Sequence, residues 1–243
     1  MSLLDTAPKR MGAFAREGTK TYRAHRVYDK LAFLVGITVV SGAVTATLVG
    51  SSATIGALLI PAMLVAIGCA LAGSFKPNLA KTVAPVYALA EGAVLGAVSK
   101  AYSNVASGIV PTAIFLTGGL FVGCLVVFRT GIVKVTPRFV SMISIGLMVL
   151  FGLYLAALFG LAVPGINSLG PKGLIFGIIG LALGLGRLFI DFDRVQQFET
   201  NAAGGGGAMT DNAEWFLSFQ LLLSLVMIYV NVLRILAASS SRR

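Results

Sequence analysis

The stretch LIFGIIGLALGLGRLFIDFDRVQ, residues 174–196, decides the fold of this chain. It begins as a long apolar run in which Arg187 is the one interior charge, and it ends on Asp191, Asp193 and Arg194. A helix needs about 20 apolar residues to cross the hydrocarbon core of a bilayer. The stretch therefore predicts a membrane-spanning helix with a carboxylate near its end, where an unpaired acid is costly and must be compensated.

The rest of the chain has the composition of a protein with many membrane spans. Its 243 residues are 57% hydrophobic and only 12% charged, with a mean hydropathy of +0.91. In a soluble domain about a quarter of the residues are charged. The apolar stretches lack the alternation expected of strands in a lipid-facing barrel, so we predict helices. Seven stretches have spanning length: residues 31–50, 55–73, 86–105, 109–128, 140–161, 174–192 and 214–237.

These spans predict an all-α, polytopic protein with seven transmembrane helices in a single membrane domain. The domain covers residues 31–238, after a basic arm at residues 1–30 and before a polar tail at residues 239–243. Residues 31–73 are apolar almost throughout, but one helix of that length would be about twice as long as the membrane is thick. Two helices joined by a tight turn are therefore expected there.

The net charge of +10 indicates the orientation of the chain in the membrane and not a nucleic-acid partner. If seven helices cross, 13 of the 19 Lys and Arg residues lie on one side, which the positive-inside rule makes the cytoplasmic side. We expect a cytoplasmic N terminus, an external C terminus and a basic arm that contacts anionic lipid. The residues on that side are Lys9, Arg10, Arg16, Lys20, Arg23, Arg26, Lys30, Lys76, Lys81, Arg129, Lys134, Arg138 and Arg194.

One face of the helix predicted for residues 174–192 carries small residues and then charges. Steps of three and four along that face lead to Arg187 and then to Asp191, so Asp191 is the expected interior carboxylate and Arg187 its nearest candidate partner. Asp193 points roughly the opposite way. A structural ion pair between Arg187 and Asp191 is the alternative to a functional site. The small residues, which let another helix approach closely, are Gly173, Gly177, Gly180 and Gly184.

Two further predicted helices carry polar residues inside the membrane. A polar stripe on the last helix should face protein or a wet cavity, and simple hydrogen bonding between helices explains it equally well. Glu91, in the third span, has no cation nearby along its helix and needs a partner on another helix, a proton or water. The stripe consists of Gln220, Ser224, Met227, Asn231 and Arg234.

Three segments resemble one known family of membrane proteins. The end of the sixth span, FIDFDRVQ at residues 189–196, and the sequence EWFLSFQLLLSLVMIYVNVLRIL at residues 214–236 resemble the C-terminal part of the Bax inhibitor-1 (transmembrane Bax inhibitor motif) family, bacterial branch. The segment EGAVLG at residues 91–96 is similar to the acidic motif in the third helix of that family. The resemblance covers roughly residues 86–238.

The resemblance implies a bundle with the seventh helix at its centre and a pH-sensitive calcium leak. Family members hold a latch between two aspartates, of which Asp191 matches the first, whereas the second falls on Ser224. A hydroxyl can hydrogen-bond Asp191, but it cannot share a proton between two carboxylates. Whether pH gating persists with Ser224 therefore stays an open question. The implied latch and ion pathway comprise Asp191, Asp193, Ser224, Glu91 and Arg187, with weak, transient calcium binding at Asp191.

Two functions of different classes follow from these observations. The first is a pH-modulated leak for calcium or another cation, gated by protonation of Asp191 at the cytoplasmic end of the sixth helix of a bacterial plasma membrane protein. The alternative is a non-conducting regulator that binds an unspecified membrane protein. We expect no enzyme and no resident cofactor, because the one histidine, His25, stands alone in the basic arm and no serine or cysteine has a nearby base.

Overall fold

The computed structural model describes residues 24–48, 52–104, 108–161, 171–203 and 211–240, and within these ranges the regular structure is helical throughout. Residues 1–23 of the predicted arm and 241–243 of the predicted tail lie outside them. The described part holds seven α-helices, as predicted, and a short 3-10 turn. They are α2 (Ala24–Leu48), α3 (Ser52–Phe75), η1 (Pro77–Leu79), α4 (Ala80–Ser103), α5 (Ile109–Arg129), α6 (Pro137–Leu158), α7 (Pro171–Ala203) and α8 (Asp211–Ser240).

Several helices are longer than the predicted spans. Six of them are long and apolar enough to cross a membrane, and α3 contributes a shorter apolar stretch at Leu59–Phe75. α2 begins at Ala24, inside the predicted arm, and α7 continues past residue 192 to Ala203. Hydropathy marks only the part of a helix that lies in lipid, whereas backbone hydrogen bonding continues into water as long as the residues favour a helix.

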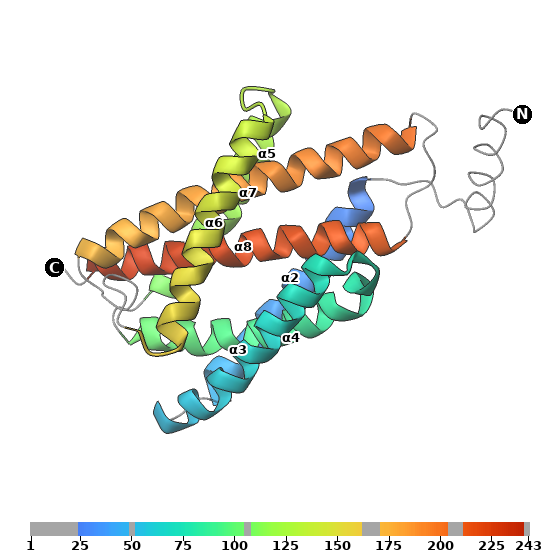
Figure 1. Ribbon diagram of the computed structural model, residues 1–243. Coiled ribbons are helices and arrows are strands. Elements are labelled where there is room, and N and C mark those ends of the chain that lie inside the picture. The colour runs from blue at the N-terminus through green and yellow to red at the C-terminus, as the bar shows by residue number, and fades with distance from the viewer. Residues whose placement is uncertain (1–23, 49–51, 105–107, 162–170, 204–210, 241–243) are drawn as a thin grey trace, which may run out of the picture.

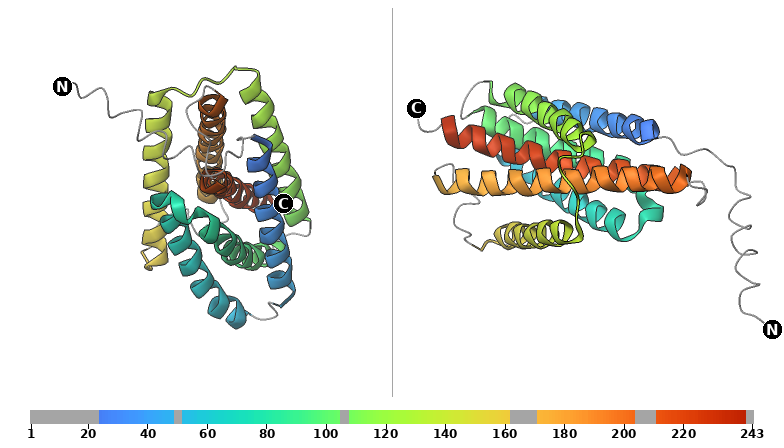
Figure 2. Two further views of the ribbon diagram at one scale, coloured as in Figure 1. Left: turned by 90° about the vertical axis from the view of Figure 1, so that its right-hand side faces the viewer. Right: turned by 90° about the horizontal axis from the view of Figure 1, so that it is seen from above.

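The helices surround the α7–α8 pair. α7 and α8 run antiparallel and side by side (Figure 1), and the end-on view of Figure 2 shows them passing between α5 and α6. α4 packs against both α2 and α3, and α3 and α4 lie below that pair in the view of Figure 1. Of the six long candidate spans, α8 has the largest buried share, 61%, and α6 the smallest, 11%. The prediction of a central last helix is therefore confirmed.

Glycines bring two pairs of helices into close contact. On α7, a Cβ added to Gly184 would lie 3.2 Å from Ile228 Cγ1 of α8, so the predicted glycine face packs against the last helix. On α4, a Cβ added to Gly92 would lie 2.5 Å from the Thr38 carbonyl oxygen of α2. Ser41 Oγ of α2 donates a hydrogen bond to the Leu89 carbonyl of α4, 2.7 Å away. Small residues thus let backbones approach where lipid gives helices no hydrophobic reason to associate.

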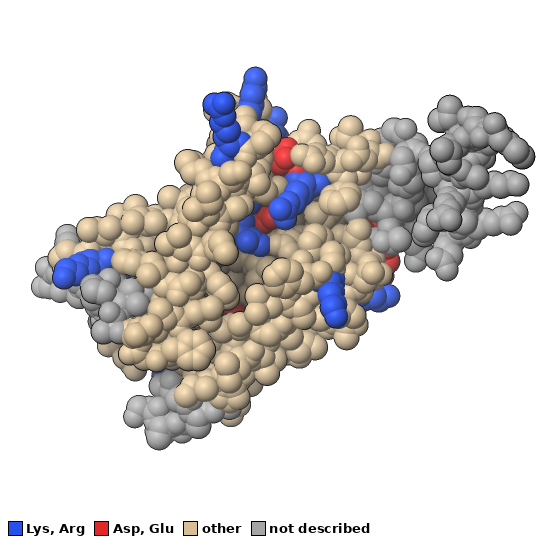
Figure 3. All heavy atoms as spheres, in the orientation of Figure 1, with Lys and Arg blue, Asp and Glu red and all other residues tan. Residues whose placement is uncertain are grey.

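The outer surface is that of a lipid-embedded protein. Large apolar side chains are exposed on α5 and α6, including Phe115 (81% exposed) and Met148 (77%). In water such a surface would aggregate, whereas in a bilayer it contacts acyl chains. Figure 3 shows one face of the molecule, where Lys and Arg side chains gather over the connection between α5 and α6 and much of the remaining surface is uncharged. The chain is an integral, multi-pass membrane protein.

Candidate functional site

A carboxylate and a hydroxyl meet in the seam between α7 and α8. Asp191 is 2% exposed and Ser224 is fully buried. Ser224 Oγ donates a hydrogen bond to Asp191 Oδ2 over 2.5 Å. The glycine face of α7 brings the two helices close enough for these short side chains to touch. The residue that the sequence identified as the interior acid is therefore bound directly to the central helix.

Arg187 connects the same carboxylate to a second polar residue of α8. Its Nε lies 3.9 Å from Asp191 Oδ2, one helical turn away, and its Nη2 donates to Gln220 Oε1 over 2.5 Å. The first distance is too long for a hydrogen bond but short enough for charge attraction in a site shielded from water. Gln220 is 4% exposed, so the guanidinium satisfies a buried amide oxygen as well as facing the acid. Arg187 thus stabilises a negative charge on Asp191.

Glu91 borders this cluster from α4. It is half-buried, and its side chain lies near that of Tyr87, one turn earlier on the same helix. The Tyr87 ring packs edge-on against Phe219 of α8, with 5.2 Å between ring centroids, and the hydroxyl is within electrostatic reach of Arg187. In the described part of the chain, no basic residue forms an ion pair with Glu91. From the sequence we expected a partner on another helix, a proton or water. The Tyr87 phenol was not predicted as a neighbour, because an aromatic residue at that spacing is typical of the core.

Asp193 does not join this cluster. Its Oδ2 accepts a hydrogen bond from Gln197 Nε2 over 2.6 Å on the exposed side of α7. Within the residues that the structure describes, no group of three or more His, Cys, Asp or Glu side chains could hold a metal ion. A calcium site that combines Asp191, Asp193 and Glu91 is therefore not assembled in this conformation.

A second charged cluster ties the beginning of α8 to α2 and α4, and the sequence did not reveal it. Lys30 Nζ lies 2.5 Å from Asp211 Oδ1 and 2.7 Å from Glu214 Oε2. Lys81 Nζ reaches Asp211 Oδ2 at 3.0 Å, and Arg26 reaches Glu214 at 3.8 Å. Glu214 is 2% exposed. The sequence does show two acidic residues in the first turn of the last helix, Asp211 and Glu214. Their basic partners could not be predicted, because they are distant in sequence.

The other half of the α8 stripe faces α6 and α7. Arg234 is 7% exposed, and its Nη1 donates to the Tyr154 hydroxyl of α6 over 2.8 Å. Asn231 is 2% exposed, and its Nδ2 donates to the Met227 carbonyl of its own helix. The polar residues of the predicted stripe are thus all buried, which agrees with a stripe that faces protein. They are Gln220, Ser224, Asn231 and Arg234.

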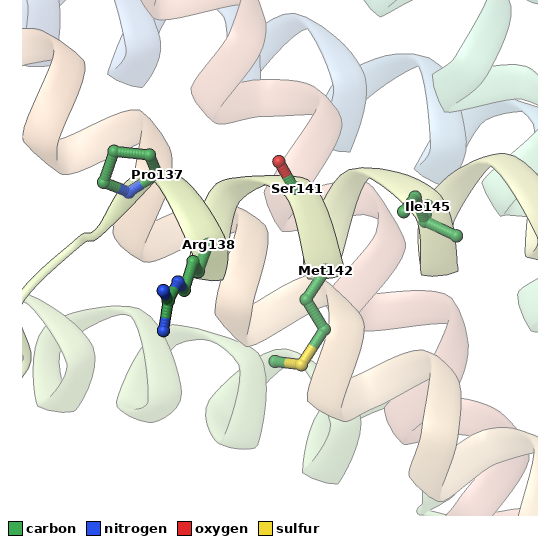
Figure 4. A pocket seen from close by; sticks show the side chains of 5 residues that line it. All are labelled: Pro137, Arg138, Ser141, Met142 and Ile145. Carbon is green, nitrogen blue, oxygen red and sulfur yellow. The ribbon is translucent and has the colours of Figure 1, made fainter.

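A surface hollow on α6 is separate from these clusters. Figure 4 shows it lined by five exposed side chains of the first turns of α6: Pro137, Arg138, Ser141, Met142 and Ile145. Because α6 supplies the whole lining among the described residues, this open hollow does not enclose a ligand. We therefore place the candidate site in the α7–α8 seam.

Comparison with known proteins identifies the family of the chain. A search of curated proteins found no match. The family model described as "Bax inhibitor 1 like" matches residues 9–241, which is nearly the whole chain and extends the resemblance noted above through α2 and α3. The chain therefore belongs to the Bax inhibitor 1 like family.

Proposed function

We propose that this protein is a passive, pH-modulated leak for cations, with calcium as the main permeant ion. The observation that carries the proposal is the hydrogen bond between Asp191 and Ser224, because it joins a buried, titratable group to the helix at the centre of the bundle. Ionisable residues buried in membrane spans are costly and are retained mainly where they serve transport or proton transfer. The family of the chain supports the same proposal.

The proton on Asp191 would act through two contacts. When Asp191 is ionised, it accepts from Ser224, attracts Arg187 and offers a negative charge to an entering cation. When it is protonated, the attraction to Arg187 is lost and the carboxyl group becomes a hydrogen-bond donor that can hold Ser224 or a backbone carbonyl. We therefore expect the flux to fall as the pH falls. Calcium binding would be weak and transient, since permeation requires release.

The orientation and the membrane complete the proposal. The excess of Lys and Arg on the side of residues 1–30 favours a cytoplasmic N terminus. We propose a bacterial plasma membrane from the resemblance to the bacterial branch of the family. Asp191 then lies in the cytoplasmic half of the bundle. We propose a transport role and not an enzymatic one, because the Ser224 hydroxyl is fully buried and already bound to the Asp191 carboxylate, so it is not exposed to a substrate.

The test is calcium flux from liposomes that contain the purified protein and a calcium dye, at several values between about pH 6 and pH 8. We expect the wild type to leak more than protein-free vesicles, with a flux that rises with pH. Asp191→Asn should lose most of that dependence, because the amide does not titrate in this range. Asp193→Asn is the matched control, since that acid lies outside the seam and should leave the profile intact. A leak in the wild type that stays constant with pH would reject the latch.

A non-conducting role as a partner for another membrane protein is the second candidate, and one observation favours it. Gly118, Gly119 and Gly123 of α5 have open space where a Cβ would be, so this lipid-facing surface is free to receive another helix. Gly177, Gly180 and Gly184 of α7, in contrast, already pack against α8. Absence of calcium flux from vesicles with correctly folded protein would favour this second function.

A further inference from the structure

Arg234 is a buried cation with no acidic partner in the described part of the chain. Its Nη1 donates a hydrogen bond to the Tyr154 hydroxyl, and its Nε is buried without a hydrogen-bond acceptor among the described residues. The Tyr154 ring lies beside the guanidinium, with 5.4 Å from Cζ to the ring centroid. A hydroxyl and a ring face reduce the cost of burying the charge, but they do not neutralise it.

Asn231 makes the surroundings of this charge polar. Its Oδ1 is buried and accepts no hydrogen bond from the described residues, one turn before Arg234 on the same face of α8. The two glycines of α7 provide the room for this pair. A Cβ on Gly177 would lie 3.5 Å from Arg234 Cγ, and one on Gly180 would run into the Asn231 amide. An unpaired donor and an unpaired acceptor on one face of a helix are typical of a place that water reaches.

The charge lies in the same seam as the proposed latch. Ser224 and Arg234 belong to one stripe of α8, ten residues apart, which corresponds to about 15 Å along the helix axis. In the inner part of the seam the Asp191 carboxylate faces Arg187, and in the outer part Arg234 has no opposing carboxylate within the described ranges. A cation that follows the seam therefore meets first a carboxylate with an arginine beside it, and afterwards an arginine with no carboxylate opposite it among the described residues.

We propose that Arg234 is a fixed electrostatic barrier that limits cation passage through the outer half of the α7–α8 seam. This inference rests on the proposed leak function and names a residue that sets its rate and selectivity. At an effective dielectric constant of about 50, between the values for a protein surface and for bulk water, a unit positive charge about 10 Å from the path of a divalent cation lowers the rate of passage by roughly tenfold. Removing the charge should raise calcium flux by that factor without raising the flux of an anion.

The test compares four variants in the same liposomes, with a calcium dye in one set and a halide-sensitive dye in another. Arg234→Gln removes the charge, and Arg234→Lys retains it. Asn231→Asp places a carboxylate beside the guanidinium and neutralises it without touching Arg234. Tyr154→Phe keeps the charge and removes the hydrogen bond that joins α6 to α8. Melting temperatures are measured alongside the fluxes. If Arg234→Gln does not fold, the calcium flux of Asn231→Asp tests the barrier in its place.

If Arg234 is the barrier, Arg234→Gln and Asn231→Asp should raise calcium flux about tenfold and leave iodide flux unchanged. Arg234→Lys and Tyr154→Phe should keep the wild-type calcium flux. Equal calcium flux in Arg234→Gln and Arg234→Lys would overturn it. So would a parallel rise of calcium and iodide, or a rise in Tyr154→Phe as large as in Arg234→Gln, since both results indicate a loosened bundle. The proposed leak is judged separately, by wild type against protein-free vesicles and against Asp191→Asn.

Discussion

Lys30 of the first described helix and Glu214 of the last are bound to each other, with 2.7 Å between Nζ and Oε2. The Glu214 side chain is 3% exposed and that of Lys30 17%, so the pair is largely shielded from water. The ammonium group also lies 5.1 Å from the ring centroid of Trp215. The helix that carries Ser224 is thus fastened at its start to the helix that follows the basic arm.

Glu214→Gln should destabilise the protein by about 3 kcal/mol, because it leaves Lys30 without its buried counter-charge. The measurement is thermal or chemical unfolding in detergent. Asp211→Asn is the control: the Asp211 side chain is 48% exposed, and we expect a loss of at most about 1 kcal/mol despite its short contact with Lys30. Equal losses of unfolding free energy in the two variants would show that burial does not determine how much each ion pair contributes to stability.

The ion pair beside the latch can be measured with a double-mutant cycle. Arg187→Gln leaves the buried Asp191 carboxylate with its hydrogen bond from Ser224, whereas Asp191→Asn removes the charge that Arg187 faces. We expect a coupling energy of about 1–2 kcal/mol from unfolding of the two single variants and the double variant, since the Arg187 side chain is 27% exposed and water weakens the attraction. Strictly additive losses would show that the charges do not interact.

Features that follow from periodicity along one helix were predictable from the sequence. The steps of three and four that lead from Gly184 through Arg187 to Asp191 place all three on one face of α7, and that face packs on α8. Contacts between distant helices were not predictable in this way. Lys30 lies 184 residues before Glu214, and Tyr154 lies 80 before Arg234. Both lysine and tyrosine are ordinary at a membrane interface, so nothing local marked them as partners.

Helix ends were missed for a related reason. The predicted spans stop where apolar residues stop, so Lys30 was assigned to the arm although it belongs to α2. Hydropathy reports where lipid ends, and the helix ends where its hydrogen-bonded backbone is interrupted. The ion pairs at the start of α8 form in this intermediate zone, in which helices are still regular but side chains are charged.

The close packing of α2 on α4 predicts a severe effect of one added methyl group. A Cβ at Gly92 would lie 2.5 Å from the Thr38 carbonyl oxygen, and a backbone oxygen cannot turn aside as a side chain can. Gly92→Ala should therefore cost about 2–3 kcal/mol in unfolding free energy. Gly152→Ala on α6 is the matched control, because a Cβ there meets no atom within 4 Å and alanine favours helix by up to about 1 kcal/mol. Similar stability of both variants would contradict the close approach of α2 and α4.

Ser224→Asp should make the calcium flux more strongly dependent on pH than in the wild type. Ser224 Oγ is 2.5 Å from Asp191 Oδ2 in a site without solvent exposure, so a carboxylate at position 224 would be forced to share a proton with Asp191. Two carboxylates that close resist being ionised together. With one proton between them, they join α7 to α8 by a hydrogen bond. When the pH rises and that proton is lost, the two negative charges repel each other.

Ser224→Ala provides the comparison for this variant, because it removes the hydrogen bond without adding a charge. We expect a steeper rise of flux between about pH 6 and pH 8 for Ser224→Asp, and a pH dependence no greater than that of the wild type for Ser224→Ala. The double variant Asp191→Asn/Ser224→Asp should lose the steepness, since a single carboxylate remains to titrate at the contact. If Ser224→Asp gives the wild-type profile, the Asp191–Ser224 contact holds the two helices together but does not control the passage of ions.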